Sequence, residues 1–164
     1  MKYSLRLKTA RFTLLSALLA FSLTIYQCDK KTDDPAPTPT VVGTWKITGL
    51  TSNPGFPISG ITITDLYSAL ALTTPCFLQM TVTFNSSGTI TLNIPTGCTL
   101  PEAQIESLTG FGRQSKWATT GNKITITASD GKTQTTYDYQ IAGTTLTMTG
   151  SNGTYTLNIK MEKA

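Results

Sequence analysis

Histidine is absent from all 164 residues of the sequence. Because histidine is the commonest general base near neutral pH and a frequent metal ligand, its absence removes the usual basis for acid–base catalysis and metal binding. Glu102 and Glu106 lie four positions apart in a short predicted helix and could share one face. Solvated helix charges are much commoner than a catalytic pair, so we expect no enzyme activity, no metal site and no cofactor.

Acidic residues are missing from the first 28 positions, whose charges are Lys2, Arg6, Lys8 and Arg11. The other nine basic residues balance nine acidic ones, so the formal charge of +4 belongs to this first segment. Charged residues make up only 13% of the chain. Nucleic-acid binding needs clustered lysine and arginine, so we expect no nucleic-acid partner.

A long apolar run is also missing. Residues 12–26 form an apolar stretch of 15 residues. A spanning helix needs about 20, so a permanent membrane anchor is the weaker alternative. An apolar stretch of 15 residues that follows a basic segment is typical of a secretory signal. We therefore predict that residues 1–27 are a signal peptide.

The residues that follow this stretch suggest how the exported protein is held. Ile25–Tyr26–Gln27 before Cys28 resembles a bacterial lipoprotein cleavage site, with larger residues than usual just before the cysteine. We expect Cys28 to be lipidated and to anchor the protein in the outer membrane, on its periplasmic or cell-surface side. The alternative is an ordinary secreted protein in which Cys28 is free.

Residues 29–40, DKKTDDPAPTPT, contain three prolines and no large apolar side chain. Such a segment is extended and solvated. We therefore predict a lipidated cysteine and flexible tether over residues 28–40, and a folded domain over residues 41–164. The charged start of the tether resembles the sorting segments of surface-exported lipoproteins of Bacteroidota; a plain soluble spacer is the alternative.

Threonine occurs 33 times and alternates with apolar residues in runs such as MTVTF, KITIT and TLTMT. A period of two predicts strands with one buried face. The pairs Gly121-Asn122, Asp130-Gly131, Gly143-Thr144 and Asn152-Gly153 are suited to the tight turns of hairpins.

These turns keep the apolar residues of successive strands on one shared face. The turn at Asp130-Gly131 sets Ile124 opposite Tyr137, and the turn at Asn152-Gly153 sets Met148 opposite Leu157. An earlier hairpin sets Phe84 against Ile90.

Continuing the register of that earlier hairpin brings Cys76 opposite Cys98, at a separation that a disulfide can bridge. Disulfides form in exported proteins, and this pair leaves Cys28 as the odd cysteine. A metal site is the rival interpretation, but two thiols without histidine make too few ligands.

The pattern predicts eight main strands, near residues 43–49, 77–85, 89–94, 113–119, 123–128, 133–141, 145–149 and 154–161. We expect an all-β fold, an eight-stranded up-and-down antiparallel barrel that removes its edges by pairing the last strand with the first. A two-sheet sandwich is the alternative. Two longer connections hold an extra short strand and one or two short helices, the second ending before Gly110 with Ile105 and Leu108 on one face.

Several of these segments resemble a known family. Gly43–Thr44–Trp45 is similar to the Gly-x-Trp signature of lipocalins, in which the tryptophan closes one end of the barrel. With LQMTVTFNSSGTITL, SKWATTGNKITIT and TTLTMTGSNGTYTLNIK, residues 41–161 resemble the lipocalin-like domains of Bacteroidota lipoproteins. Lipocalins also carry an arginine near the last strand that packs over the tryptophan, and here that strand offers Lys160.

Eight strands enclose an interior that side chains just fill or that holds one small ligand. The first function that we consider is the binding of a small apolar ligand, and the second is a structural or protein-interaction module of the cell envelope with a filled core and an unknown partner. The candidate lining residues, whose ordinary role would be hydrophobic core, are Trp45, Phe84, Trp117, Tyr137, Tyr139, Met148 and Leu157.

Overall fold

The computed structural model describes residues 40–58, 60–98, 102–151 and 153–164. The predicted signal peptide, the predicted lipidation site Cys28 and the tether up to residue 39 lie outside the described residues. The described strands are β1 (Gly43–Ile58), β2 (Ile61–Asp65), β3 (Thr81–Phe84), β4 (Ile90–Asn93), β5 (Lys116–Thr120), β6 (Lys123–Thr127), β7 (Gln134–Ala142), β8 (Thr145–Ser151) and β9 (Thr156–Lys163). The described helices are α2 (Leu66–Thr73), the 3-10 helix η1 (Pro75–Gln79) and α3 (Glu102–Thr109).

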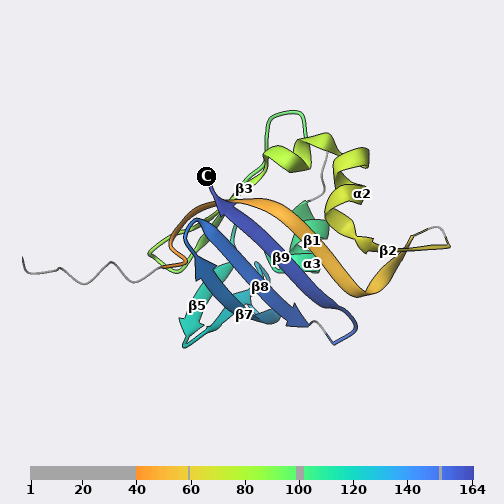
Figure 1. The fold of residues 1–164 in the computed structure, drawn as a ribbon. Coiled ribbons are helices and arrows are strands. Elements are labelled where there is room, and N and C mark those ends of the chain that lie inside the picture. Colours follow the sequence, from red (N-terminus) through yellow and green to blue (C-terminus); the bar gives the residue numbers. More distant parts are fainter. Residues whose placement is uncertain (1–39, 59, 99–101, 152) are drawn as a thin grey trace, which may run out of the picture. The chain divides into compact units, whose positions relative to one another are not determined.

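Eight of the strands form the predicted antiparallel barrel (Figure 1). Their order across the sheet is β4, β3, β1, β9, β8, β7, β6, β5. An isolated bridge between Thr89 and Lys116 joins the two ends of this order, so the barrel is nearly closed. The last strand pairs with the first as expected, while β2, the predicted extra strand, pairs with the far half of β1.

A β-bulge divides β1 into two parts. Ile47 pairs with Met161 and Gly49 pairs with Lys160, so one extra residue, Thr48, lies between the two pairs. An extra residue changes which positions face inward, because side chains alternate along a strand. Trp45 and Ile47 are therefore buried before the bulge, and Leu50 and Ser52 after it.

Most of the predicted hairpin registers are confirmed. Ile124 pairs with Tyr137, and Phe84 pairs with Ile90. The prediction for the last hairpin is wrong by two residues, because Met148 pairs with Ile159 and not with Leu157. The ladder resumes only at Thr156, so the connection is longer than a two-residue turn; an even shift leaves the same side chains facing inward.

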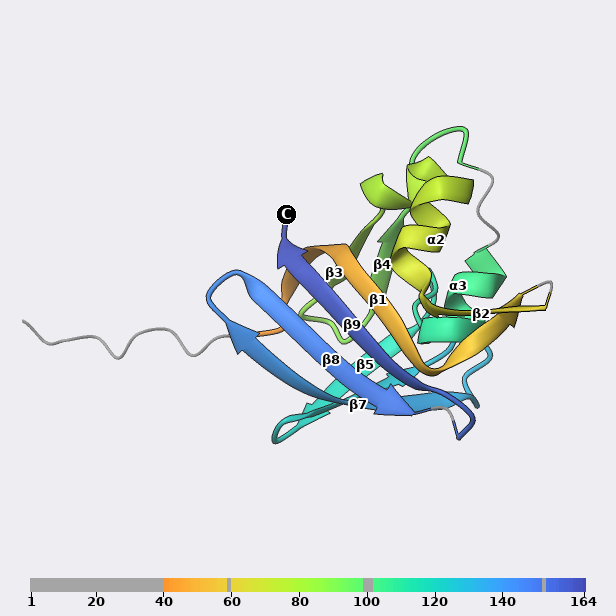
Figure 2. The ribbon, with the colours of Figure 1, turned by 45° about the vertical axis from the view of Figure 1, so that its right-hand side comes forward.

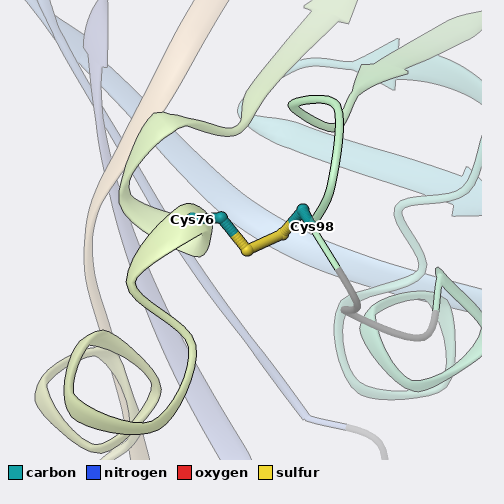
Figure 3. Close-up of a disulfide and its surroundings, with 2 residues drawn as sticks. All are labelled: Cys76 and Cys98. Carbon is teal, nitrogen blue, oxygen red and sulfur yellow. A yellow bond between two sulfur atoms is a disulfide. The ribbon is translucent and has the colours of Figure 1, made fainter.

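The Cys76–Cys98 disulfide is confirmed, but the predicted strand over residues 77–85 is wrong in its first half (Figure 3). Residues 75–79 form η1, and β3 begins only at Thr81. Pro75 lacks a backbone N–H for a ladder and suits the first turn of a helix. The Cα atoms of Cys76 and Cys98 are 5.6 Å apart. Because Cys76 lies in η1, the bond joins η1 to the segment that follows β4.

Figures 1 and 2 place α2 and α3 on one side of the barrel, toward the part of β1 that pairs with β2. Asp65 caps α2, and its carboxylate accepts hydrogen bonds from the backbone and the hydroxyl of Ser68. α3 ends before Gly110 as predicted, with Ile105 buried and Leu108 partly buried against the core. None of the helices in the described ranges is long and apolar enough to span a membrane.

Removing the disulfide should destabilise the fold. Its two cysteines are 22 residues apart in the sequence, and closing a loop of that length stabilises by about 3 kcal/mol in the chain-entropy model. We expect the double variant Cys76→Ser, Cys98→Ser to lose about this much free energy of unfolding. Urea denaturation followed by tryptophan fluorescence measures the loss, and Cys28→Ser is the control. An unchanged midpoint in the double variant would contradict the prediction.

Candidate functional site

Five of the seven candidate lining residues lie in the barrel interior. Each exposes 1% or less of its surface, so these side chains pack against other protein atoms on nearly all sides. Burying an aromatic or aliphatic side chain of this size contributes about 1.5–3 kcal/mol to stability. In this conformation they are hydrophobic core, and a ligand enters only if interior side chains move. The five are Trp45, Phe84, Tyr137, Met148 and Leu157.

Tyr137 is the largest polar side chain of this interior. A Cβ atom at Gly150 would lie only 2.5 Å from the Tyr137 ring, so the missing side chain at Gly150 lets that ring lie close against β8. The Tyr137 hydroxyl donates a hydrogen bond to the Thr109 carbonyl over 3.0 Å. Burial raises the pKa of Tyr137 well above its ordinary value, so the hydroxyl keeps its proton and remains a donor.

The other two candidates are only partly buried. The Trp117 indole N–H donates to the Asn85 carbonyl over 3.1 Å, and its ring contacts Phe84 edge-to-face with centroids 5.6 Å apart. The Tyr139 hydroxyl lies 3.4 Å from the Gly121 carbonyl at the β5–β6 turn. Both aromatic rings therefore reach the core while their polar atoms lie toward its margins.

The cation over Trp45 is Lys163, whereas the sequence comparison with lipocalins pointed only to Lys160 in place of the arginine. The Lys163 ammonium lies 5.7 Å from the centroid of the Trp45 ring. The difference follows from the register, since Trp45 pairs with Lys163 while the bulge sets Lys160 opposite Gly49. The Trp45 indole N–H donates to the Val41 carbonyl over 2.7 Å, which fixes the ring across the interior.

Phe111 and Ser52 are among the interior residues that sequence reasoning missed. Phe111 follows α3 in a loop, yet it is fully buried, and its ring meets Phe84 edge-to-face with centroids 6.0 Å apart. No periodic pattern includes a loop residue, so the sequence gives no signal for Phe111. Ser52 is 4% exposed, and its hydroxyl has no hydrogen-bond partner among the described residues. Strict alternation from Trp45 would make Ser52 face outward, and the bulge reverses this.

Glu106, half of the acidic pair on α3, braces the loop that carries Phe111. Its carboxylate accepts from the backbone N–H of Ser129 over 2.6 Å and from the Ser129 hydroxyl over 2.8 Å. The Ser115 hydroxyl lies 3.0 Å from the same carboxylate. A Cβ atom at Gly112 would lie 2.5 Å from it, so this close approach depends on glycine there.

These contacts set the pKa of Glu106. Partial burial raises it, but the hydrogen bonds from Ser129 and Ser115 together outweigh burial and the nearby charge of Asp130. The pKa of Glu106 therefore lies below its ordinary value. Glu102, the other member of the pair, forms an ion pair with Arg113 at 3.2 Å and accepts from the Arg113 backbone N–H. Both carboxylates thus have structural partners.

A polar hollow of about 240 Å³ lies on the outer face of β7 and β8. An apolar ligand needs an apolar lining, so this hollow does not suit one. Its lining residues are Asn122, Asp138, Tyr139, Gln140, Thr147 and Thr149.

The lowered pKa of Glu106 predicts a pH-dependent contribution to stability. A depressed folded-state pKa means that the contribution is complete above the unfolded pKa and is lost as the pH falls through the folded one. We expect Glu106→Gln to lose about 1 kcal/mol of unfolding free energy at neutral pH and less in acid. Urea denaturation at stepped pH measures this. Glu162→Gln, at an exposed site 4.0 Å from Lys160, is the control. A loss from Glu106→Gln that is equal at every pH would contradict the prediction.

Comparison with known proteins agrees with the barrel and its signature strand. The lipocalin-like domain family matches residues 41–148, more than half of the chain. Among solved structures, a variant of the fluorescent protein UnaG matches with 21% identity and a TM-score of 0.34, over 76% of this chain and 96% of that chain. A search of curated proteins gives no match. The match over residues 41–148 confirms the resemblance of the opening and central strands, and the chain belongs to the lipocalin-like domain family.

Proposed function

We propose that this protein is an outer-membrane lipoprotein whose barrel binds a small apolar molecule bearing one polar group. The observation that carries the proposal is the Ser52 hydroxyl, which is buried in a largely apolar interior and has no hydrogen-bond partner among the residues that the structure describes. An unsatisfied buried hydroxyl costs about 1–3 kcal/mol. A ligand that supplied a hydrogen bond at this point would recover that free energy, and its apolar part would meet the surrounding core.

The neighbours of Ser52 define the chemistry around it. Ser52 pairs with Leu157, Leu157 pairs with Gly150, and Gly150 pairs with Tyr137. These four residues form one row across β1, β9, β8 and β7. The row offers apolar surface, an aromatic ring and the Ser52 hydroxyl, which suits a ligand with a single polar group better than a charged or highly polar one.

The proposed export to the cell envelope is supported by the first 40 residues of the sequence. The basic segment, the apolar stretch and the cysteine at position 28 support export followed by lipidation, and the proline-rich tether supports a barrel held away from its anchor. The resemblance of these features to lipoproteins of Bacteroidota supports the same assignment. We include a role without catalysis in the proposal, because Glu102 and Glu106 both have structural partners.

The packed interior favours a second candidate, a structural or protein-interaction module with a filled core. Its specific support is the near-zero exposure of Trp45, Phe84 and Tyr137. This candidate predicts that no small molecule accompanies the protein. Native mass spectrometry of the protein purified from its own cells separates the two candidates, because a co-purifying mass favours the binding function and its absence favours the filled module.

The proposed role of Ser52 can be tested with N-phenyl-1-naphthylamine, an apolar fluorescent probe with one N–H donor. We expect the wild type to bind the probe and Ser52→Ala to bind it about tenfold more weakly, the value of one hydrogen bond. Because the hydroxyl has no partner among the described residues, Ser52→Ala should not lower the free energy of unfolding. Thr51→Ala, on the exposed face of the same strand, is the matched control. Equal affinity of Ser52→Ala and the wild type would refute the role of Ser52.

Lipidation can be tested separately by metabolic labelling with an alkyne fatty acid. We expect the label in the wild-type protein and none in Cys28→Ser, while Cys76→Ser, Cys98→Ser labels normally. The reason is that only the cysteine behind the signal segment is available to the lipoprotein pathway. Full labelling of Cys28→Ser would refute the assignment.

A further inference from the structure

The wall of the barrel has one weak seam, between β4 and β5. The bridge between Thr89 and Lys116 is flanked by hydrogen bonds from the Ile90 N–H to the Ser115 carbonyl and from the Trp117 N–H to the Gly88 carbonyl, each 2.8 Å long. Within the described ranges no other pairing joins β4 to β5. Neighbouring strands elsewhere in the barrel share ladders of at least four residue pairs. The seam is therefore held by far fewer backbone hydrogen bonds than the rest of the wall.

Residues 110–115, which we call the plug, lie between α3 and this seam. Phe111 is the plug's buried aromatic residue, and it inserts against Phe84 in the interior. Connecting segments normally run over the surface, so a fully buried aromatic ring in this loop is unusual. Phe84 also contacts Trp117, which places three aromatic rings in series from the plug to β5.

Side-chain contacts hold most of the plug. One backbone hydrogen bond, from the Ile90 N–H to the Ser115 carbonyl, joins its last residue to β4, and Arg113 is tied to α3 by its ion pair and backbone hydrogen bond with Glu102. The Ser115 hydroxyl accepts from the Gly112 N–H over 2.9 Å and lies 2.8 Å from the Gly110 carbonyl. The Glu106 carboxylate reaches this hydroxyl and also binds Ser129 in the β6–β7 turn. We call these contacts, centred on Glu106, the latch. The Ser129 end of the latch is exposed, where water competes for each hydrogen bond.

Resting on the proposed binding function, we infer that the plug is a displaceable gate and that Phe111 occupies the ligand's place. When the latch opens and the plug moves out, the interior gains the volume of a phenyl ring next to Phe84. The Tyr137 hydroxyl, which now donates to the Thr109 carbonyl at the base of the plug, becomes free to donate to a ligand. The site would therefore take a flat aromatic group with one polar atom, which the Tyr137 hydroxyl can meet as a donor or as an acceptor.

The first test opens the latch without touching the interior. In Glu106→Gln of the full mature chain, we expect amide hydrogens of residues 110–117 to exchange at least tenfold faster, while β7, β8 and β9 keep their wild-type rates. Asp138→Asn is the matched control, because it makes the same change on the outer face of β7, where the Asp138 carboxylate forms an ion pair with the exposed Lys123. Wild-type exchange of residues 110–117 in Glu106→Gln would overturn the gate.

The second test removes the ring. We expect Phe111→Ala to bind N-phenyl-1-naphthylamine at least tenfold more tightly than the wild type, and Phe111→Leu to lie between them. Glu106→Gln should accelerate the association of the same probe. If Phe111→Ala does not fold, the gate is tested by the exchange rates of Glu106→Gln and by the affinity of Phe111→Leu for the probe. Wild-type values in both would overturn it. A folded Phe111→Ala with wild-type affinity would overturn the inference.

The two proposals fail in distinguishable ways. Probe binding by the wild type, with unchanged association and exchange in Glu106→Gln, would leave the binding function standing and reject the gate. Faster exchange of the plug in Glu106→Gln, with no probe bound by the wild type or by Phe111→Ala, would reject the binding function and the ligand's place at Phe111.

Discussion

The rest of the structure depends on the pairing of β1 with β9. This ladder joins the first strand of the barrel to the last, and β1 also pairs with β3 on its other edge. It therefore links the β3–β4 hairpin to the meander that runs from β5 to β9. Without it, two open sheets would expose their apolar faces to water. The contact between Trp45 and Lys163 and the inward position of Leu50 both follow from the register of this ladder.

A barrel closed in this way leaves little empty room inside. Its strands contribute the layers of core residues, and the loop after α3 contributes Phe111. Family membership alone does not decide between binding and structural support, since an eight-stranded barrel can serve either. Most of the core side chains are carried by strands, whereas Phe111 is carried by a loop that is held in part by the polar contacts of Glu106 and Glu102.

Most of the fold was predictable because threonine alternation and turn-forming pairs are local signals that agree with one another. The disulfide partners were also predictable, although Pro75 replaces the expected strand with η1. The bulge at Thr48 and the longer connection before Thr156 could not be predicted, because no local residue pattern marks an extra residue in irregular backbone. The bulge decides that Ser52 faces inward, and the register of β1 with β9 decides that Lys163 lies beside Trp45.

The bulge in β1 has a consequence beyond the register. Within the described ranges, Ser52 carries a buried hydroxyl without a partner because one extra backbone residue precedes it; with strict alternation, Thr51 would face inward. The chemistry of the interior is thus set by the length of a strand segment as much as by its composition. Relatives of this domain could acquire or lose an internal polar group through a single-codon insertion or deletion, a route of divergence that comparing side chains column by column would overlook.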